Sequence, residues 1–270
     1  MIGLKSLPQE YLDWNERWGA PYGRAEAREL SIRQRFVSDD PAAYGPFAFQ
    51  VCNHTRVFEY PWAYFTAELK PGMRVLDVGG GLGGLQYVLA QEDLEVVNVD
   101  PEAKVTERTW SGFPSAAVPL NPDNHAQLNE VFGTAVTLVP EKVQESGLEP
   151  GTFDRAFCLS VIEHVSQDEA KAMVGAVRDL LKPGGLLLLT IDLFLDVKPF
   201  GVLDTNVWGT NIDVKALVDA SGMELAEGDP AELHGFPEFD LDKVVKRMPE
   251  YFMGYFSALS QALVLRKPAA

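Results

Sequence analysis

Residues 75–84 read VLDVGGGLGG, an apolar run that ends in a cluster of glycines, and residues 85–90 continue as LQYVLA. The apolar run is typical of a short buried strand, and the segment after the glycines has the composition of a helix. Glycine allows the sharp turn between them and lets the backbone approach a ligand closely. Backbone N–H groups and the positive end of the helix dipole then face that ligand. The stretch therefore predicts a strand, a glycine turn and a helix that together cradle a cofactor.

The glycine spacing alone fits two kinds of adenosine cofactor. Gly79, Gly81 and Gly84 satisfy G-x-G-x-x-G, the dinucleotide fingerprint, while Asp77 begins a run that satisfies D-x-G-x-G-x-G. The next apolar run ends at Asp100, and an acid at the end of the second strand can accept both ribose hydroxyls of an adenosine. Asp100 suits either cofactor, so residues further along the chain must decide between them.

Two downstream stretches decide between these cofactors. Residues 153–165 read FDRAFCLSVIEHV and residues 180–190 read LLKPGGLLLLT. Together with the acid two residues before the glycines, they resemble the class I S-adenosylmethionine-dependent methyltransferases, in which a Phe-Asp pair begins the fourth strand and a Leu-Lys-Pro-Gly-Gly turn precedes the fifth. Any single motif is weak evidence, whereas three in order at compatible spacing are specific. The resemblance covers residues 60–228 and a final strand at 261–266.

The resemblance implies an α/β fold with a Rossmann-like, doubly wound, mostly parallel seven-stranded sheet whose last strand is antiparallel. The alternation of strands and helices along the chain agrees with it, because parallel sheets carry helices on both faces. We expect strands at 73–78, 95–99, 135–139, 154–159, 186–191, 223–227 and 261–266, and a helix at 213–221.

Two segments fall outside this core pattern. Residues 1–70 are rich in aromatic side chains and lack strand periodicity, and apolar side chains recur near helical spacing in residues 229–259. Because ligands bind at the carboxyl ends of the strands in such sheets, both segments are candidates to cover the site. The expected units are an N-terminal helical cap (1–70), a cofactor-binding core (71–228), a lid-like insertion (229–259), and a final core strand with a tail (260–270).

The resemblance implies that S-adenosylmethionine is the cofactor and assigns it to the carboxyl ends of the strands. Asp77 anchors its amino-acid end, Asp100 holds the ribose, and Ser160 faces it from the end of the fourth strand. The acid that would read the adenine is expected near residues 141–143 but is displaced or absent there. The expected cofactor-binding residues are Asp77, Gly79, Gly80, Gly81, Gly83, Asp100, Lys142, Val143, Ser160 and Arg56. Local capping by Asp77 and a simple turn at Ser160 remain alternative interpretations.

The chemistry implied by the resemblance is an in-line displacement in which an acceptor atom attacks the sulfonium methyl group. The enzyme must hold the two reactants aligned and remove a proton where the acceptor carries one, and it needs no covalent intermediate. The candidate catalytic residues are His164 after the fourth strand, Asp192 at the end of the fifth, and His234 in the insertion. His54 belongs to the cap, and His125 is expected at the surface at the start of a helix.

A magnesium site remains an alternative interpretation of the acids on loops. Asp192, Asp196, His234 and Glu238 could together bind the ion and a substrate diol. The sequence has no dense ligand motif at these positions, and solvated loop acids explain the same residues. We therefore predict no metal.

The composition of the chain limits the classes of molecule that it can bind. The formal charge is −16, from 39 acidic against 23 basic residues, which opposes binding to nucleic acid because phosphates require a concentrated basic face. Two cysteines are too few for a disulfide framework, and the longest apolar runs fall short of the roughly 20 residues of a membrane helix. With no signal-peptide pattern at the N-terminus, we expect a cytoplasmic enzyme that acts on a small molecule.

Three functions from different classes stay open at this stage. The first is a methyltransferase that acts on O, N or C of a small molecule, with the aromatic segments favouring a partly apolar one such as a secondary metabolite. The second is an NAD-dependent oxidoreductase that uses the same glycines, although Tyr or Lys proton donors at dehydrogenase spacing are not evident. The third is a methyltransferase fold with a non-methylating or regulatory role, because a fold does not fix a function.

Overall fold

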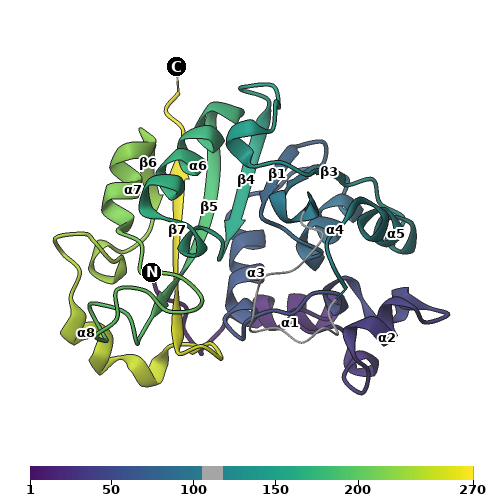
Figure 1. The fold of residues 1–270 in the computed structure, drawn as a ribbon, viewed down its shortest axis with the longest axis horizontal. Coiled ribbons are helices and arrows are strands. Elements are labelled where there is room, and N and C mark those ends of the chain that lie inside the picture. The colour runs from purple at the N-terminus through teal and green to yellow at the C-terminus, as the bar shows by residue number, and fades with distance from the viewer. Residues whose placement is uncertain (105–117, 270) are drawn as a thin grey trace.

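The sheet has the expected number and direction of strands. The computed structural model describes residues 1–104 and 118–269, and within them seven strands form one sheet in the order β3-β2-β1-β4-β5-β7-β6 (Figure 1). β7 is antiparallel to both of its neighbours, and the other pairs are parallel. The predicted fold class is therefore confirmed. The strands are β1 (Arg74–Val78), β2 (Glu95–Val99), β3 (Thr137–Val139), β4 (Phe153–Leu159), β5 (Leu181–Phe194), β6 (Glu224–Glu227) and β7 (Ala258–Arg266).

The strand order reverses between β1 and β4. From β1 the chain runs outward through β2 to β3 and then returns to β4 on the other side of β1. A crevice opens at the carboxyl ends of the strands at such a reversal, and ligands bind there. Gly79, Asp100 and Ser160 directly follow β1, β2 and β4, and Asp192 lies near the end of β5. The topology thus gathers four of the predicted site residues at one edge of the sheet.

β5 is longer than the sequence predicts. It spans Leu181–Phe194 rather than 186–191, and it pairs with β7 over nine positions that end at Phe194 and Ala258. β7 accordingly begins three residues earlier than expected. The two strands extend each other, because each supplies the hydrogen-bond partners that allow the other to continue. The extension keeps Asp192 inside the sheet instead of in the loop that follows.

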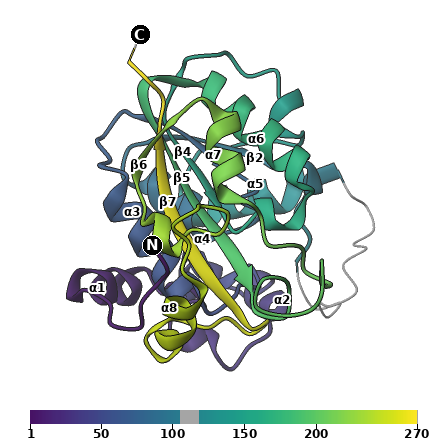
Figure 2. The same ribbon diagram turned by 90° about the vertical axis from the view of Figure 1, so that its left-hand side faces the viewer.

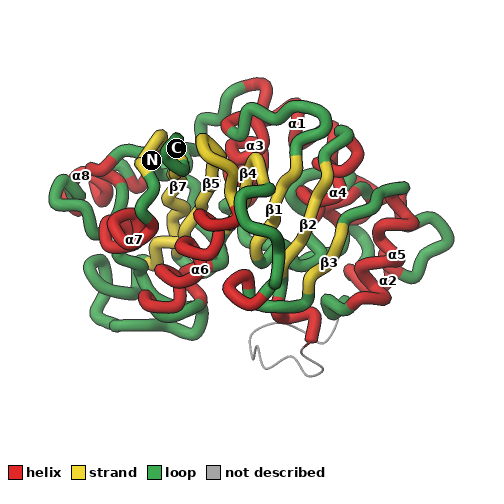
Figure 3. Tube along the Cα trace, turned by 90° about the horizontal axis from the view of Figure 1, so that it is seen from above, coloured by secondary structure: helices red, strands yellow, loops and turns green. Residues whose placement is uncertain are grey.

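Helices cover both faces of the sheet (Figure 3). Alternate residues of β1 face opposite sides, so Val75 enters one hydrophobic core and Leu76 the other. None of the described helices is both long and apolar enough to cross a bilayer. One face carries α1 (Gln9–Trp18), α3 (Arg56–Thr66), α4 (Gly84–Gln91) and α5 (Pro122–Phe132), and the other carries α6 (Gln167–Leu180) and α7 (Val214–Ser221). The short helices α2 (Ile32–Phe36) and α8 (Leu241–Lys246) belong to the segments before and after the core.

The N-terminal segment is helical and aromatic, as expected, and it shares a hydrophobic core with the sheet. Trp14 of α1 packs edge-on against Phe47, and both belong to the same buried cluster as Trp62 and Phe157 of β4. The cap therefore lies directly on the sheet face through α3. This shared core contains residues on both sides of the predicted boundary at residue 70. The domain boundaries themselves stay a prediction.

The insertion of residues 229–259 contacts the N-terminal segment near both of its ends (Figure 2). Near its start, Glu232 accepts a hydrogen bond from the backbone N–H of Ile2 at 2.9 Å. Near its end, the backbone N–H of Tyr255 donates to Oδ1 of Asn53 at 2.8 Å. The two segments outside the methyltransferase-like core are thus joined to each other.

Candidate functional site

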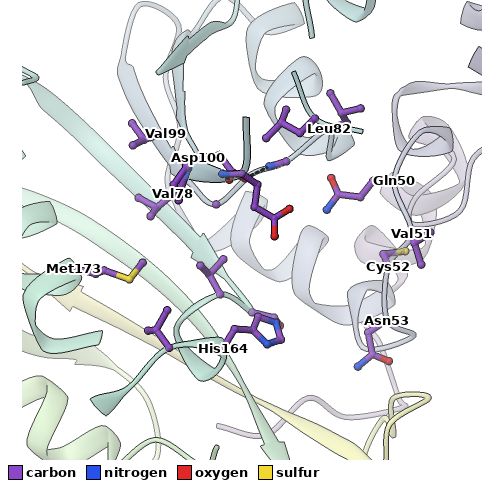
Figure 4. Close-up of a pocket in the computed structure, with 18 of the residues that line it drawn as sticks. Gln50, Val51, Cys52, Asn53, Val78, Leu82, Val99, Asp100, His164 and Met173 are labelled. Carbon is purple, nitrogen blue, oxygen red and sulfur yellow. Dashed lines mark hydrogen bonds between the residues drawn. The ribbon is translucent and has the colours of Figure 1, made fainter. Parts of the chain in front are cut away.

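A cavity of about 530 Å³ opens at the carboxyl ends of β1, β2, β4 and β5. Its volume lies within the range of about 300–1,000 Å³ that is usual for small-molecule sites. In Figure 4, Val78, Val99 and Asp100 line it from the sheet side, and Gln50, Cys52 and Asn53 face them from the N-terminal segment. The cavity therefore lies between the sheet and the cap, at the reversal of strand order.

The glycine turn borders this cavity and requires its glycines. Gly79 has φ +70° and Gly81 has φ +57°, conformations that side chains rarely adopt. A Cβ on Gly81 would lie 2.6 Å from Oε1 of Gln50. A Cβ on Gly80 would lie 2.3 Å from Oδ2 of Asp77. Gly79 and Gly81 line the cavity, so the backbone itself forms this wall and leaves room for a ligand to approach.

Buried polar side chains hold the turn from behind. Gln86 donates to the carbonyls of Gly81 and Gly83 at 3.1 and 3.0 Å, and Asn98 donates to the Gly81 carbonyl at 2.9 Å. The imidazole Nε2 of His125 lies 3.0 Å from Oε1 of Gln86. The prediction of a surface position for His125 is wrong, because only 2% of the residue is exposed. Burial lowers the pKa of this imidazole to about 4, so the network is neutral.

The two predicted acids of β1 and β2 have different surroundings. Asp100 lines the cavity, where its carboxylate accepts from the backbone N–H groups of Gly81 at 3.0 Å and Glu102 at 2.9 Å. Asp77 is 5% exposed and lies behind the turn. Burial, reinforced by the charge of Asp100, raises the pKa of Asp77 to about 7. A cationic group brought near Asp77 would favour its ionised form.

The segment after β3 reaches the cavity without the acid that the family resemblance expects. Lys142 and Val143 line the cavity, together with Gln144. The ammonium group of Lys142 donates to Glu169 at 2.5 Å. Glu141 is not among the cavity-lining residues, and its carboxylate pairs with Lys104. This part of the cavity is thus lined by an apolar side chain and by polar groups of the turn after β3.

Arg56 lies at the first turn of α3 and reaches the ends of β4 and β5. Its guanidinium donates to Oγ of Ser160 at 2.8 Å and forms an ion pair with Glu59, which is fully buried. Glu59 also accepts from Ser160 at 3.2 Å and from Thr190 at 3.1 Å. Ser160 has φ +47°, a left-handed conformation that residues other than glycine rarely adopt. The structure therefore brings two predicted cofactor residues, Arg56 and Ser160, into contact.

Asp192 reaches the cavity from β5, beside this group. Its carboxyl accepts from Ser160 at 3.4 Å and from Nδ2 of Asn53 at 3.5 Å, and the residue is 5% exposed. Burial raises the pKa of Asp192 well above its usual range, and the carboxylates of Glu163 and Glu59 raise it further. Such a perturbed acid in a cleft is typical of a functional site.

His164 lines the cavity from the short 3-10 helix η6 (Ile162–His164), and Figure 4 shows its ring pointing toward the open space. Nδ1 hydrogen-bonds to the backbone carbonyl of Trp208. Because a carbonyl only accepts, Nδ1 carries the proton and the lone pair is on Nε2. Burial lowers the pKa of this imidazole, which keeps it neutral. His164 and Asp192, two predicted catalytic residues, thus lie in one cavity.

The structure does not bring the third catalytic candidate there. His234 is absent from the described residues that line the cavity, and its Nδ1 lies 3.0 Å from the carbonyl of Ile212. The four residues of the magnesium interpretation are not gathered in one place either. Over residues 1–104 and 118–269, no group of three or more His, Cys, Asp or Glu side chains is arranged to hold a metal ion. Asp196 instead accepts from Asn206 on an exposed loop.

Sequence reasoning missed several residues of the site. Gln50, Asn53 and Glu59 lie in the aromatic segment, where they carry no recognisable motif. Glu163 directly precedes His164 in the sequence. Its place just after a buried strand is a signal that could have identified it, because the same signal identified His164. Gln86 lies in a helix and Asn98 in a strand, and nothing in the sequence distinguishes them from other polar residues in such elements.

Comparison with known proteins identifies the family of this chain. The sequence model of a family described as "Methyltransferase domain" matches residues 54–216. The ubiquinone biosynthesis O-methyltransferase of Xanthomonas campestris pv. campestris (strain B100) is 34% identical over 122 residues, which are 44% of this chain and 43% of that protein. The chain thus spans less than half the length of this curated relative.

Solved structures share the fold. The [4+2]-cyclase SpnF aligns with a TM-score of 0.55 at 14% identity, over 93% of this chain and 100% of that one. Magnesium protoporphyrin IX methyltransferase (ChlM) from Synechocystis PCC 6803, solved with bound SAH, aligns with a TM-score of 0.50 at 18% identity, over 77% of this chain and 80% of that one. At these identities the likeness shows the fold alone.

Proposed function

The chain belongs to the methyltransferase domain family, and on that premise we propose that it transfers the methyl group of S-adenosylmethionine to a small molecule. The observation that carries the proposal is the cavity at the strand-order reversal, which the glycine turn and Asp100 border on one side and His164 and Asp192 on the other. A cofactor site, a proton acceptor and a group that positions the acceptor molecule, all in one space, are what a methyl transfer to a protonated acceptor requires.

Several residues that line the cavity have side chains or backbone groups that would hold S-adenosylmethionine. Asp100 would accept the ribose hydroxyls, and the bare backbone at Gly79 and Gly81 leaves space that a Cβ would fill. Arg56 would pair with the carboxylate of the amino-acid end, and Asp77 would favour its ammonium group. Val143 and the Lys142 backbone would contact the adenine.

When bound, the cofactor supplies an electrophilic methyl carbon on a sulfonium centre. The residues of this chain hold that carbon in line with the acceptor atom and exclude water from the two. Trp208 and Phe256, whose ring centroids are 3.8 Å apart, line the cavity and provide an apolar wall. His164 accepts the acceptor's proton at Nε2, since its Nδ1–H is committed to the Trp208 carbonyl.

A methyl-transfer screen tests the proposal. The protein is incubated with S-adenosylmethionine labelled in the methyl group and with a panel of phenols, catechols, amines and carboxylic acids. We expect label in at least one product, and S-adenosylhomocysteine formed in equal amount. Cofactor binding without label in any product would contradict the proposed methyl transfer and favour a non-methylating role for the fold.

A further inference from the structure

We propose that the methyl acceptor is an amine that enters the cavity as an ammonium ion and pairs with the carboxylate of Asp192. This inference rests on the proposed methyl transfer and deepens it by naming the class of acceptor. Its basis is a group of four charged side chains at the acceptor end, Arg56, Glu59, Glu163 and Asp192, which we call the charged cluster.

The charged cluster joins three separate elements. Arg56 and Glu59 come from α3, Glu163 from η6, and Asp192 from β5. Glu59 and Glu163 are fully buried and Asp192 is 5% exposed. Asp192 and Arg56 are the members that line the cavity. Three carboxyl groups and one guanidinium therefore meet at a place with little water.

The cluster has three acids and one guanidinium, so its acids cannot all be ionised without a further cation. Within the cluster, the guanidinium of Arg56 forms an ion pair with Glu59 and donates to Ser160, so its positive charge is shared with only one of the three acids. Both oxygens of Glu163 are buried, and no side chain in the part of the chain that the structure describes hydrogen-bonds to them. Among the neighbouring charges, that of Glu163 has the largest effect on the pKa of Asp192, after burial itself. Ionising a buried carboxyl group without a cationic partner is costly, so a cation beside Asp192 would favour the ionised form of that acid.

An amine suits this setting better than a hydroxyl. Removing the proton of a hydroxyl would create an oxyanion beside Asp192 and Glu163, which like charges oppose. Removing one proton from an ammonium ion leaves a neutral amine with a lone pair. After the transfer, the nitrogen is cationic again and faces the same carboxylate. The charged cluster therefore stabilises the bound acceptor and the product, and the positive charge that develops on nitrogen between them.

The step balances with the residues present. The ammonium ion gives one proton to Nε2 of His164. The nitrogen lone pair then forms the N–C bond to the methyl carbon as the C–S bond breaks, and the electrons of that bond stay on sulfur. Asp192 remains ionised throughout and holds the nitrogen in place. No oxidant, reductant or further reactant enters the balance.

Matched amine and alcohol probes test this inference by binding. Benzylamine and benzyl alcohol, and cyclohexylamine and cyclohexanol, are titrated by calorimetry into the protein saturated with S-adenosylhomocysteine. We expect each amine to bind about tenfold more tightly than its alcohol. Asp192→Asn should abolish this preference, while Glu163→Gln should reduce it. Glu238→Gln, which removes an exposed carboxylate outside the cavity, should leave it unchanged.

The pH profile gives a readout that does not depend on a variant. The groups that face Asp192 are Glu163, Glu59, Arg56 and His164, and burial with the two acids raises its pKa. Amine binding should therefore strengthen as the pH rises above the ordinary titration range of an aspartate and Asp192 ionises, while alcohol binding stays flat. Equal binding of amine and alcohol, or no binding of either, would overturn the inference.

The outcomes separate this inference from the proposed function. If S-adenosylhomocysteine itself does not bind, the proposed methyl transfer fails. If it binds normally and the amines show no preference, the acceptor class alone is wrong. If Asp192→Asn weakens S-adenosylhomocysteine as much as it weakens the amines, Asp192 belongs to the cofactor site, which also overturns the inference.

Discussion

The nucleotide end and the acceptor end of the cavity are built by different means. At the nucleotide end, one stretch from β1 to Asp100 supplies the turn, and neutral side chains such as Gln86 hold it through backbone carbonyls. At the acceptor end, the charged cluster draws on three elements far apart in the sequence. The first depends on backbone shape and the second on charge balance. Substitutions should therefore have different consequences at the two ends.

The largest effect is expected at the turn. Gly81→Val should abolish S-adenosylmethionine binding in calorimetry, because a branched side chain resists φ +57° and its Cβ would meet Gln50 at 2.6 Å. Gly147→Val is the matched control, since Gly147 has φ +64° with nothing within 4 Å of the added Cβ. It should lose stability while it keeps its affinity. If Gly81→Val binds S-adenosylmethionine with the wild-type affinity, the glycine turn does not contact the cofactor and is only a structural turn.

The next effect separates the two histidine candidates at the acceptor end. With any acceptor that accepts label, His164→Asn should lower kcat by about 100-fold and leave the dissociation constant of S-adenosylmethionine unchanged. His234→Asn, outside the cavity, should retain full turnover. Because burial lowers the pKa of His164, the acid limb of wild-type kcat should lie below the ordinary value of about 6.5. A larger loss of turnover in His234→Asn than in His164→Asn would reverse the assignment.

A smaller effect is expected on the ribose contact. Asp100→Ala should weaken S-adenosylmethionine by about 1–3 kcal/mol, because a charged acceptor of two hydroxyl groups is lost. Glu95→Gln changes an exposed carboxylate at the opposite end of the same strand and should bind as the wild type does. An unchanged dissociation constant in Asp100→Ala would remove this acid from the cofactor site.

The smallest effects are expected in the free energy of unfolding, measured in urea without ligand as a function of pH. One titrating group at each end of the cavity should give this free energy a different pH dependence. His125 has a lowered pKa of about 4, so the unfolded chain gains a proton first and stability is lost as pH falls from about 6.5. Glu163 has a raised pKa of about 8, so the stability of its protonated form is lost as pH rises from about 4.5. Each slope is at most about 1.4 kcal/mol per pH unit.

Two variants isolate these slopes. His125→Gln should flatten the acid side of the stability curve, and Glu163→Gln should flatten the neutral side. If the free energy of unfolding of both variants follows the wild-type curve from about pH 4 to pH 8, His125 and Glu163 do not titrate differently in the folded and unfolded chain, which would contradict this account.

The sequence predicts the nucleotide end well because its signals are local. The run from Val75 to Gly84 fixes a strand, a turn and a helix, and the structure places each there with Asp100 beside the turn. His125 was misplaced because its burial depends on a contact with Gln86, 39 positions away. Periodicity around a helix start cannot report such a contact.

The acceptor end was predicted only in part. His164 and Asp192 were identified because they follow strands, and the structure places both in the cavity. Glu59 was missed because its partners Ser160 and Thr190 lie 101 and 131 positions away. His234 was expected near the site from its place between the last two strands, yet its ring bonds to Ile212 instead. Side-chain charge clusters depend on packing that no local pattern encodes.

The measurement that tests the central claim most directly is a pair of calorimetric titrations of the protein, one with S-adenosylmethionine and one with NAD. The account predicts one S-adenosylmethionine bound per chain, with affinity lost in Gly81→Val, and no heat from NAD at the same concentrations. Saturable binding of NAD, or no binding of S-adenosylmethionine to a folded protein, would contradict it.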